Sequence, residues 1–170
     1  MRRVHGSVLA ILAMLAASGC QRGEDEEALV VEGRLFTFNY RVATATYVLT
    51  LGRNRPLPDD ARLIATYENP AGGTPLTTRT RIYPFWDKIA LESPPVHCVV
   101  KNRPYAVKIE IVDASGSPLQ TIETTVTSSL DQTVLPAKPL VVGAIYTANP
   151  EVYRPGETPD FSPEGGCPKP

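Results

Sequence analysis

Apolar and polar residues alternate with a period of two along much of the chain, which is typical of strands with one buried and one solvated face. The clearest stretch is 105–112, where four apolar residues fall on one face and Lys108 and Glu110 fall on the other. Residues 113–118 then have turn chemistry, and residues 120–128 alternate again. The two alternating stretches predict a β-hairpin.

Other short stretches also have strand character. They are residues 30–38, 44–51, 61–68, 76–83 and 86–91. Residues 140–146 are apolar on both faces, which predicts a covered strand. Seven or eight short strands separated by turns predict an all-β fold, an antiparallel β-sandwich, with an up-and-down barrel as the alternative.

The C-terminal stretch, residues 149–170, differs from the rest because it contains six prolines and three glycines. Proline lacks the N–H donor that a sheet needs, so this stretch predicts an irregular tail over the surface, tied back by Cys167. Simple disorder is the alternative. The predicted β-sandwich domain therefore covers residues 29–148, and the tail follows it.

The N-terminus begins with Arg2 and Arg3, followed by an apolar run over residues 8–17. Ten helical residues rise only about 15 Å, whereas the hydrocarbon core of a bilayer is about 30 Å thick. The run is therefore too short to span a membrane and has the character of a cleavable signal. Small residues, 17–19, lead directly into Cys20.

This arrangement resembles a bacterial lipoprotein signal that ends in a lipobox cysteine, and an ordinary secretory signal is the alternative. The resemblance implies removal of residues 1–19, a diacylglycerol thioether on the sulfur of Cys20 and a third acyl chain on its amine. Gln21 after the cysteine implies sorting to the outer membrane. We therefore expect a protein held by acyl chains on the periplasmic face of the outer membrane, since two or more chains give stable anchoring.

Charge is unevenly distributed along the chain. Residues 21–28 carry four acids and one arginine, which predicts an extended acidic tether over residues 20–28. Residues 29–148 hold twelve bases and ten acids, so they are nearly balanced. The chain lacks the basic patch of a nucleic-acid-binding protein, and we expect no nucleic-acid partner.

Two cysteines remain if Cys20 is lipidated, and an even pair in an oxidising compartment predicts a disulfide between Cys98 and Cys167. A zinc or redox site is the alternative, but the chain has no C-x-x-C. His97 and Cys98 are adjacent, and neighbouring side chains of a strand point to opposite faces. We therefore predict no metal site and no cofactor.

Candidate catalytic residues are few. His97 is the one histidine after Cys20, and the chain contains no Gly-x-Ser-x-Gly motif. The adjacent acids Asp59 and Asp60 follow a proline and are expected to be solvated turn residues. No phosphate loop or dinucleotide fingerprint is present. We therefore predict no catalytic residues and a non-enzymatic function.

The most suggestive cluster is residues 83–86, Tyr-Pro-Phe-Trp, with Arg79 and Arg81 before it and Lys88 after it. Aromatic side chains beside bases can stack on sugars or anchor a partner, which makes Trp86, Arg79 and Arg81 candidate partner-binding residues. In the other interpretation, Phe85 and Trp86 are core and edge residues around a strand break at Pro84.

Three short motifs carry a family resemblance: residues 57–61 (LPDDA), the pair Pro84-Phe85, and the strand pattern Tyr105-x-Val107-x-Ile109. They resemble the small lipoproteins related to the type III secretion pilotin, or lipochaperone. The resemblance implies a lipid-anchored β-sandwich that binds or assists another envelope protein. A carbohydrate- or peptidoglycan-binding module, or an inhibitor of a cell-wall enzyme, is the second hypothesis, and a periplasmic enzyme is the third.

The lipid anchor is testable at Cys20. We expect Cys20→Ser to abolish labelling by a fatty-acid probe and to move the protein out of the membrane fraction, because the acceptor sulfur is lost. Metabolic acyl labelling with cell fractionation measures both effects. Labelling that persists in the variant would disprove acylation at this residue.

Overall fold

The computed structural model describes residues 27–168. The predicted signal over residues 1–19, Cys20 and all of the predicted tether before Glu27 lie outside the described residues. In residues 27–168, no helix is long and apolar enough to cross a bilayer. A single turn of 3₁₀-helix, η1 (Gln132–Val134), is the one helical element of this part of the chain.

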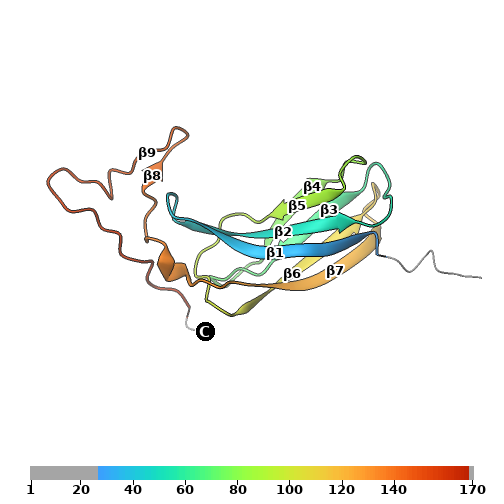
Figure 1. The fold of residues 1–170 in the computed structure, drawn as a ribbon, viewed down its shortest axis with the longest axis horizontal. Coiled ribbons are helices and arrows are strands. Elements are labelled where there is room, and N and C mark those ends of the chain that lie inside the picture. Colours follow the sequence, from blue (N-terminus) through green and yellow to red (C-terminus); the bar gives the residue numbers. More distant parts are fainter. Residues whose placement is uncertain (1–26, 169–170) are drawn as a thin grey trace, which may run out of the picture.

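The fold is an all-β antiparallel sandwich, as predicted (Figure 1). Its strands are β1 (Leu29–Asn39), β2 (Thr44–Arg53), β3 (Arg62–Tyr67), β4 (Leu76–Arg81), β5 (Lys88–Glu92), β6 (Pro104–Val112) and β7 (Pro118–Thr127). One sheet has the order β1-β2-β5 and the other has the order β4-β3-β6-β7. The predicted hairpin over 105–128 is confirmed as β6 and β7, which pair in antiparallel register.

The alternation in the sequence sets the two layers. Buried and exposed residues alternate along β5 and most of β6. Along most of β2 and β3, buried residues alternate with partly buried ones. Each of these strands therefore turns one row of side chains toward the core. Leu49, Leu63 and Ile109 from the inner rows have no exposed surface. Burying each such side chain stabilises the fold by about 1.5–3 kcal/mol.

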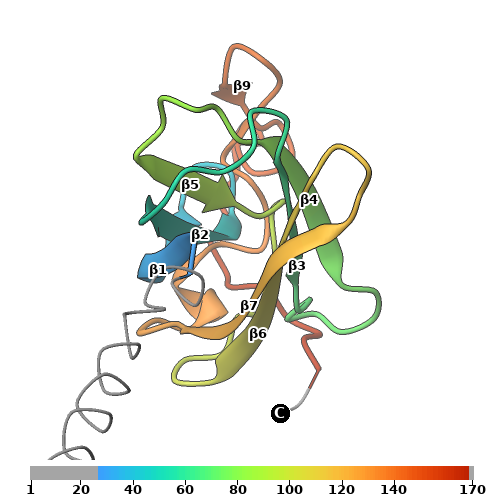
Figure 2. The same ribbon diagram turned by 90° about the vertical axis from the view of Figure 1, so that its right-hand side faces the viewer.

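The two sides of the sandwich differ. On one side β1, an edge strand of the first sheet, lies beside β7, an edge strand of the second, as the view along the sandwich shows (Figure 2). The Gln120 amide closes this side, because it donates to Leu29 O at 2.7 Å and accepts from Leu29 N at 3.0 Å. On the other side, β4 and β5 are both edge strands.

A cluster of aromatic rings fills the space between the sheets. The ring of Tyr47 lies 5.3 Å from that of Tyr67 and 6.3 Å from that of Tyr105, and Phe36 packs against it at 4.3 Å. Each hydroxyl has a partner: Tyr47 donates to Glu68 O at 2.7 Å, and Tyr105 accepts from the backbone N–H of Val100 at 2.7 Å. The Tyr67 hydroxyl lies 3.3 Å from Thr78 Oγ1. The tyrosine rings thus fill the space between the sheets, and their buried hydroxyls are all hydrogen-bonded.

The C-terminal segment leaves the sandwich after β7. The predicted covered strand over residues 140–146 is wrong, because the chain there forms two short strands, β8 (Val141–Val142) and β9 (Thr147–Ala148), around a tight turn. Ile145 is 87% exposed. The backbone carbonyl of Arg41 accepts hydrogen bonds from Leu140 N and Val141 N, so this hairpin attaches to the β1–β2 turn and lies outside the core.

The buried tyrosines predict a loss of stability at high pH. Burial, reinforced by the Glu68 carboxylate, raises the pKa of Tyr47. An unfolded tyrosine loses its proton at about pH 10, whereas the folded Tyr47 retains it, so the unfolded state binds fewer protons and the free energy of unfolding falls as the pH rises above about 10. Urea titrations across this range should show a shallower fall for Tyr47→Phe than for the wild type. If the free energy of unfolding fell equally steeply with pH in Tyr47→Phe and in the wild type, Tyr47 would not be the source of this loss.

Candidate functional site

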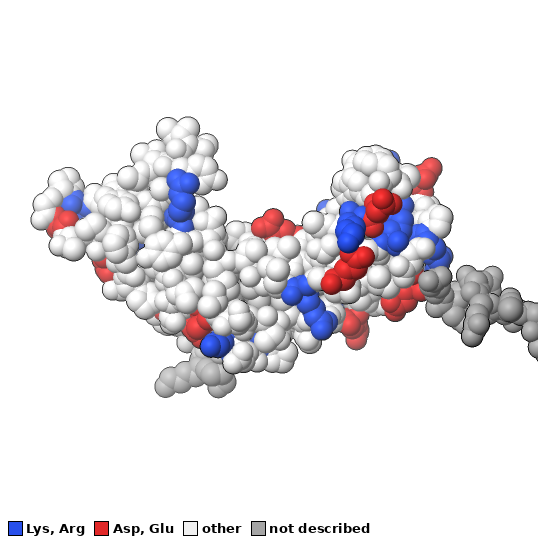
Figure 3. Space-filling view, in the orientation of Figure 1, with Lys and Arg blue, Asp and Glu red and all other residues white. Residues whose placement is uncertain are grey.

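The residues predicted to bind a partner lie at the end of the sandwich where the described chain begins. Asn54 N donates to Ala28 O at 3.0 Å, and Arg53 N donates to Asp87 O at 2.9 Å, which places the loop between β4 and β5 beside the start of β1. On the face shown in Figure 3, lysine, arginine, aspartate and glutamate side chains gather at this same end. The candidate site therefore lies at an end of the molecule that carries both positive and negative side chains.

The loop over residues 82–87 is fixed to the sheets at both of its ends. Ile82 is 2% exposed, and its N–H donates to Ala61 O at 3.1 Å. Trp86 N donates to Tyr83 O at 3.1 Å, which closes a four-residue turn with Pro84 in its second position, where the fixed φ of proline suits a turn. The turn therefore connects the edge strands of the two sheets, β4 and β5, in a fixed conformation.

The guanidinium of Arg53 ties this turn to β2. Its two terminal nitrogens donate to Pro84 O at 3.0 Å and to Tyr83 O at 2.8 Å. Hydrogen bonds from a charged donor contribute about 1.5–3 kcal/mol, more than neutral ones. The Nε atom of Arg53 is buried and has no hydrogen-bond partner among the described residues.

Three aromatic rings form a cluster on the turn, which we call the aromatic cluster: Tyr83, Phe85 and Trp86. The Tyr83 ring lies 5.6 Å from that of Phe85 and 4.8 Å from that of Trp86. Trp86 is partly buried and packs against the core, whereas Phe85 is 75% exposed. The sequence analysis named Trp86 as the candidate binding residue, whereas in the structure Trp86 supports the cluster and Phe85 is its exposed ring.

The bases predicted beside the cluster occupy the outer face of β4. Arg79 and Arg81 are both exposed there, and the guanidinium carbon of Arg81 lies 5.4 Å from the centre of the Tyr83 ring. Lys88 is at the start of β5 and pairs with Glu32 at 2.8 Å instead. The structure therefore brings Arg81 to the aromatic cluster, with Arg79 on the same face of β4, and it pairs Lys88 elsewhere.

An open hollow of about 520 Å³ lies beside the two arginines, between β4 and the turn that joins β6 to β7. Its polar lining includes Asp60, Arg62, Arg79, Arg81 and Asp113. Hydrogen bonds from Ser115 Oγ and Ser117 N lower the pKa of Asp113, so this carboxylate stays ionised but is engaged within its own turn. In the part of the chain that the structure describes, no carboxylate lies within 4.0 Å of the three guanidinium groups.

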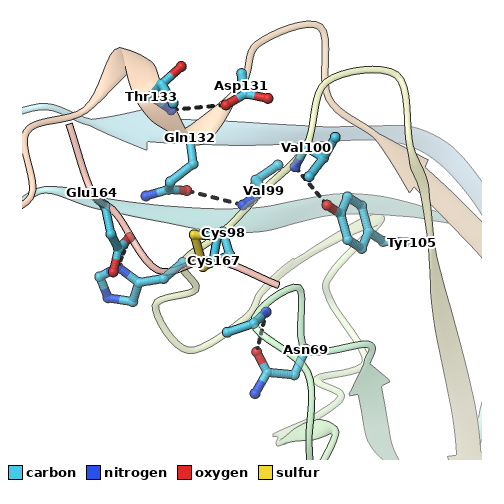
Figure 4. Close-up of a disulfide and its surroundings, with 12 residues drawn as sticks. Asn69, Cys98, Val99, Val100, Tyr105, Asp131, Gln132, Thr133, Glu164 and Cys167 are labelled. Atoms are coloured by element: carbon cyan, nitrogen blue, oxygen red, sulfur yellow. Dashed lines mark hydrogen bonds and ion pairs between the residues drawn. A yellow bond between two sulfur atoms is a disulfide. The ribbon is translucent and has the colours of Figure 1, made fainter. Parts of the chain in front are cut away.

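The predicted disulfide is present at the opposite end of the sandwich (Figure 4). Cys98 and Cys167 are bonded, with their Cα atoms 5.3 Å apart. Cys98 has φ of 64°, a conformation uncommon for residues other than glycine, and it leads into a hydrogen bond from Gln132 N to Val99 O at 2.7 Å. The disulfide thus joins the β5–β6 connection to the C-terminal segment.

His97 lies beside the disulfide, and its Nδ1 is 3.0 Å from Glu164 Oε2. No other hydrogen-bond partner of the ring exists among residues 27–168. Glu164 also lies within 4.8 Å of the sulfurs of Cys98 and Cys167, a spacing that suits a metal ion. Both sulfurs are consumed by the disulfide, however, so neither is a thiolate that can bind a metal.

The C-terminal segment exposes apolar side chains that were not predicted from the sequence. Its exposed side chains include Leu130, Val134, Val142, Ile145, Tyr146, Tyr153 and Phe161. The guanidinium of Arg41 lies 5.2 Å from the centre of the Tyr146 ring. Apolar residues on both faces of 140–146 were the signal, and they were assigned to a covered strand instead of an exposed hairpin.

No protein-family model matches the chain, and no curated protein matches it.

Removing the disulfide should loosen the C-terminal segment while leaving the sandwich folded, because the strands of both sheets end at Thr127. For the sequence separation of 69 residues, the chain-entropy estimate of the stabilisation is roughly 4 kcal/mol. We expect the Cys98→Ser/Cys167→Ser variant to be cut by protease within residues 129–168 while residues 29–127 stay intact. Cleavage starting within β1–β7 would contradict this division.

Proposed function

We propose that the chain is a lipid-anchored, non-catalytic envelope protein that binds or assists a partner protein, in the manner of the pilotin-like lipoproteins that it resembles. The partner-binding surface is the aromatic cluster together with Arg81 beside it and Arg79 on the same face of β4. Anchoring through acyl chains on Cys20 places the protein at the periplasmic face of the outer membrane. The proposal assigns the chain no cofactor and no reaction.

The observation that carries the proposal is the exposure of Phe85 on a turn that is held in place. A phenylalanine that is 75% exposed loses the free energy of burial that its ring would otherwise gain. The hydrogen bonds from Arg53 fix the turn that presents it. Little conformational entropy remains to be lost on binding, and a rigid aromatic anchor beside arginine is the composition of binding hot spots.

The position of the site relative to the anchor also supports this function. The site lies at the end where the chain enters the sandwich, as the bond from Asn54 N to Ala28 O indicates. Residues 21–28 between Cys20 and β1 extend to at most about 28 Å. A partner bound at this end therefore lies close to the membrane surface, where another envelope protein is available.

A carbohydrate or peptidoglycan ligand is the second candidate, and the Tyr83 and Phe85 rings favour it because exposed aromatic faces stack on sugars. The arginines nearby could donate hydrogen bonds to its hydroxyl or carboxylate groups. Sedimentation with purified peptidoglycan sacculi separates the candidates, since a partner protein is not required for that binding.

The test is Phe85→Ala in the full chain. We expect capture of the partner from detergent-solubilised envelopes to fall on the order of tenfold or more, because central aromatic anchors contribute about 2 kcal/mol or more to binding. The free energy of unfolding should change little, since the ring is exposed. Quantitative mass spectrometry of the co-purified proteins and urea titration measure the two effects.

Ile145→Ala is the matched control, because Ile145 is also exposed and apolar but lies on the C-terminal hairpin. It should leave capture unchanged. Trp86→Ala is expected to lower stability as well as capture, because Trp86 packs against the core. If His97→Ala alone abolished the cellular role while Phe85→Ala behaved as wild type, the binding proposal would fail in favour of a site at His97.

A further inference from the structure

The free edge of β4 is a second feature of this end of the molecule. Ile82 N bonds to Ala61 O at 3.1 Å, and in an antiparallel pair every second residue shares this bonding direction. Thr77, Arg79 and Arg81 therefore direct their N–H and C=O groups away from β3. None of these groups has a hydrogen-bond partner in the described chain.

Such an edge is able to pair with another strand, and proteins usually protect it with proline, a bulge or a covering segment. The strand β4 contains no proline, and its register with β3 has no bulge. By contrast, β1 has a bulge between Val31 and Gly33, and the Gln120 amide bonds to the backbone of Leu29 at its start. The β4 edge is thus less protected than the edge on the other side of the sandwich.

The side chains on this edge repel one another. Arg62 lies directly opposite Arg81 in a pair without mutual backbone hydrogen bonds, where Cα atoms approach to about 4.5 Å, and Arg79 lies on the same face. Like charges opposite each other destabilise a sheet. Farther across the same outer face, Lys108 has a carboxylate partner in Glu110 at 2.9 Å, whereas the three arginines have none among residues 27–168.

We propose that the β4 edge accepts an extended acidic segment of the partner protein as a fifth strand of this sheet. The main chain of that segment bonds to Thr77, Arg79 and Arg81, and acidic side chains at alternate positions lie opposite Arg79 and Arg81. Its other side chains face Thr78 and Thr80, which are half-buried, so small or β-branched residues fit there. This inference rests on the proposed function and names the chemistry of the partner.

A second copy of the chain fits the edge poorly. Two β4 strands paired in antiparallel fashion around Arg79 place the two Arg79 side chains opposite each other, which adds to the repulsion already present. The free edge of β5 is also a poor site for an acidic strand, because its outer face carries Glu92 and its Lys88 is already paired with Glu32. Charge therefore favours an acidic strand at β4.

The experiment measures binding of a fluorescent peptide of about eight residues, in which glutamate alternates with threonine and valine, to the full chain in detergent. We expect binding to wild type, and a loss of about tenfold in affinity for Arg79→Glu/Arg81→Glu. A peptide with lysine in place of glutamate should bind this variant better than it binds wild type. Lys101→Glu/Lys108→Glu changes the charge equally and should leave the affinity for the acidic peptide within about twofold of wild type.

Thr77→Pro tests the backbone pairing without removing an arginine. Its N–H faces solvent, so an edge strand tolerates proline there, but a carbonyl of the incoming strand then loses the N–H that would donate to it. We expect Thr77→Pro to weaken the acidic peptide about tenfold, with Thr77→Ala unchanged. Equal affinity for Thr77→Pro and Thr77→Ala, or no binding to wild type, would overturn the proposal.

The acidic residues 24–27 of this chain are the competing occupant. If replacing these four acids with glutamine or asparagine raised the affinity for the peptide about tenfold, the edge would belong to the chain's own segment and the partner proposal would be wrong. The two proposals also fail separately. If Phe85→Ala lost capture of the partner but the wild type did not bind the peptide, the partner function would stand and the edge site would be wrong. If the wild type bound the peptide but captured no partner, the edge site would stand and the partner function would be wrong.

Discussion

The rest of the fold depends on the need to bury three tyrosine rings without leaving their hydroxyls unpaired. Tyr47 reaches Glu68 O just beyond β3, and Tyr105 accepts the N–H of Val100 in the connection before β6. A one-residue slip of either strand would turn these rings to solvent and leave buried polar groups unsatisfied. The hydroxyls therefore fix the register of both sheets and the conformation of the loops at one end.

The alternation of residue types was enough to predict most of the sandwich, because a row of apolar side chains in a strand has to meet another such row. The same reasoning failed at residues 140–146. Their apolar side chains do not cover a face of the core, and the backbone N–H groups of Leu140 and Val141 instead donate to the carbonyl of Arg41. Local pattern does not contain this information. The pairing of Cys98 with Cys167 followed from the expectation that Cys20 carries lipid, because the other two of the three cysteines then allow a single disulfide.

For the candidate site, the sequence pointed to Trp86, whereas the structure leaves Phe85 as the more exposed ring of the aromatic cluster. Trp86 and Phe85 are neighbours of similar chemistry, and the turn closed by Trp86 N and Tyr83 O decides which of them faces solvent. The role of Arg53 was not predictable either, because it is 30 residues away from Tyr83 in the chain. Both results depend on tertiary contacts, whereas the outward direction of Arg79 and Arg81 follows from the strand period alone.

The disulfide also constrains the order of events as the chain folds. The strands of both sheets end at Thr127, whereas Cys167 arrives forty residues later. The sandwich is therefore able to assemble while Cys98 still has a free thiol, whereas the disulfide-bonded Cys98 of the finished protein is only 8% exposed. A chain that stops short of Cys167 keeps Cys98 without this partner, so the oxidation state of Cys98 reports whether the chain extends to Cys167 and has folded around it.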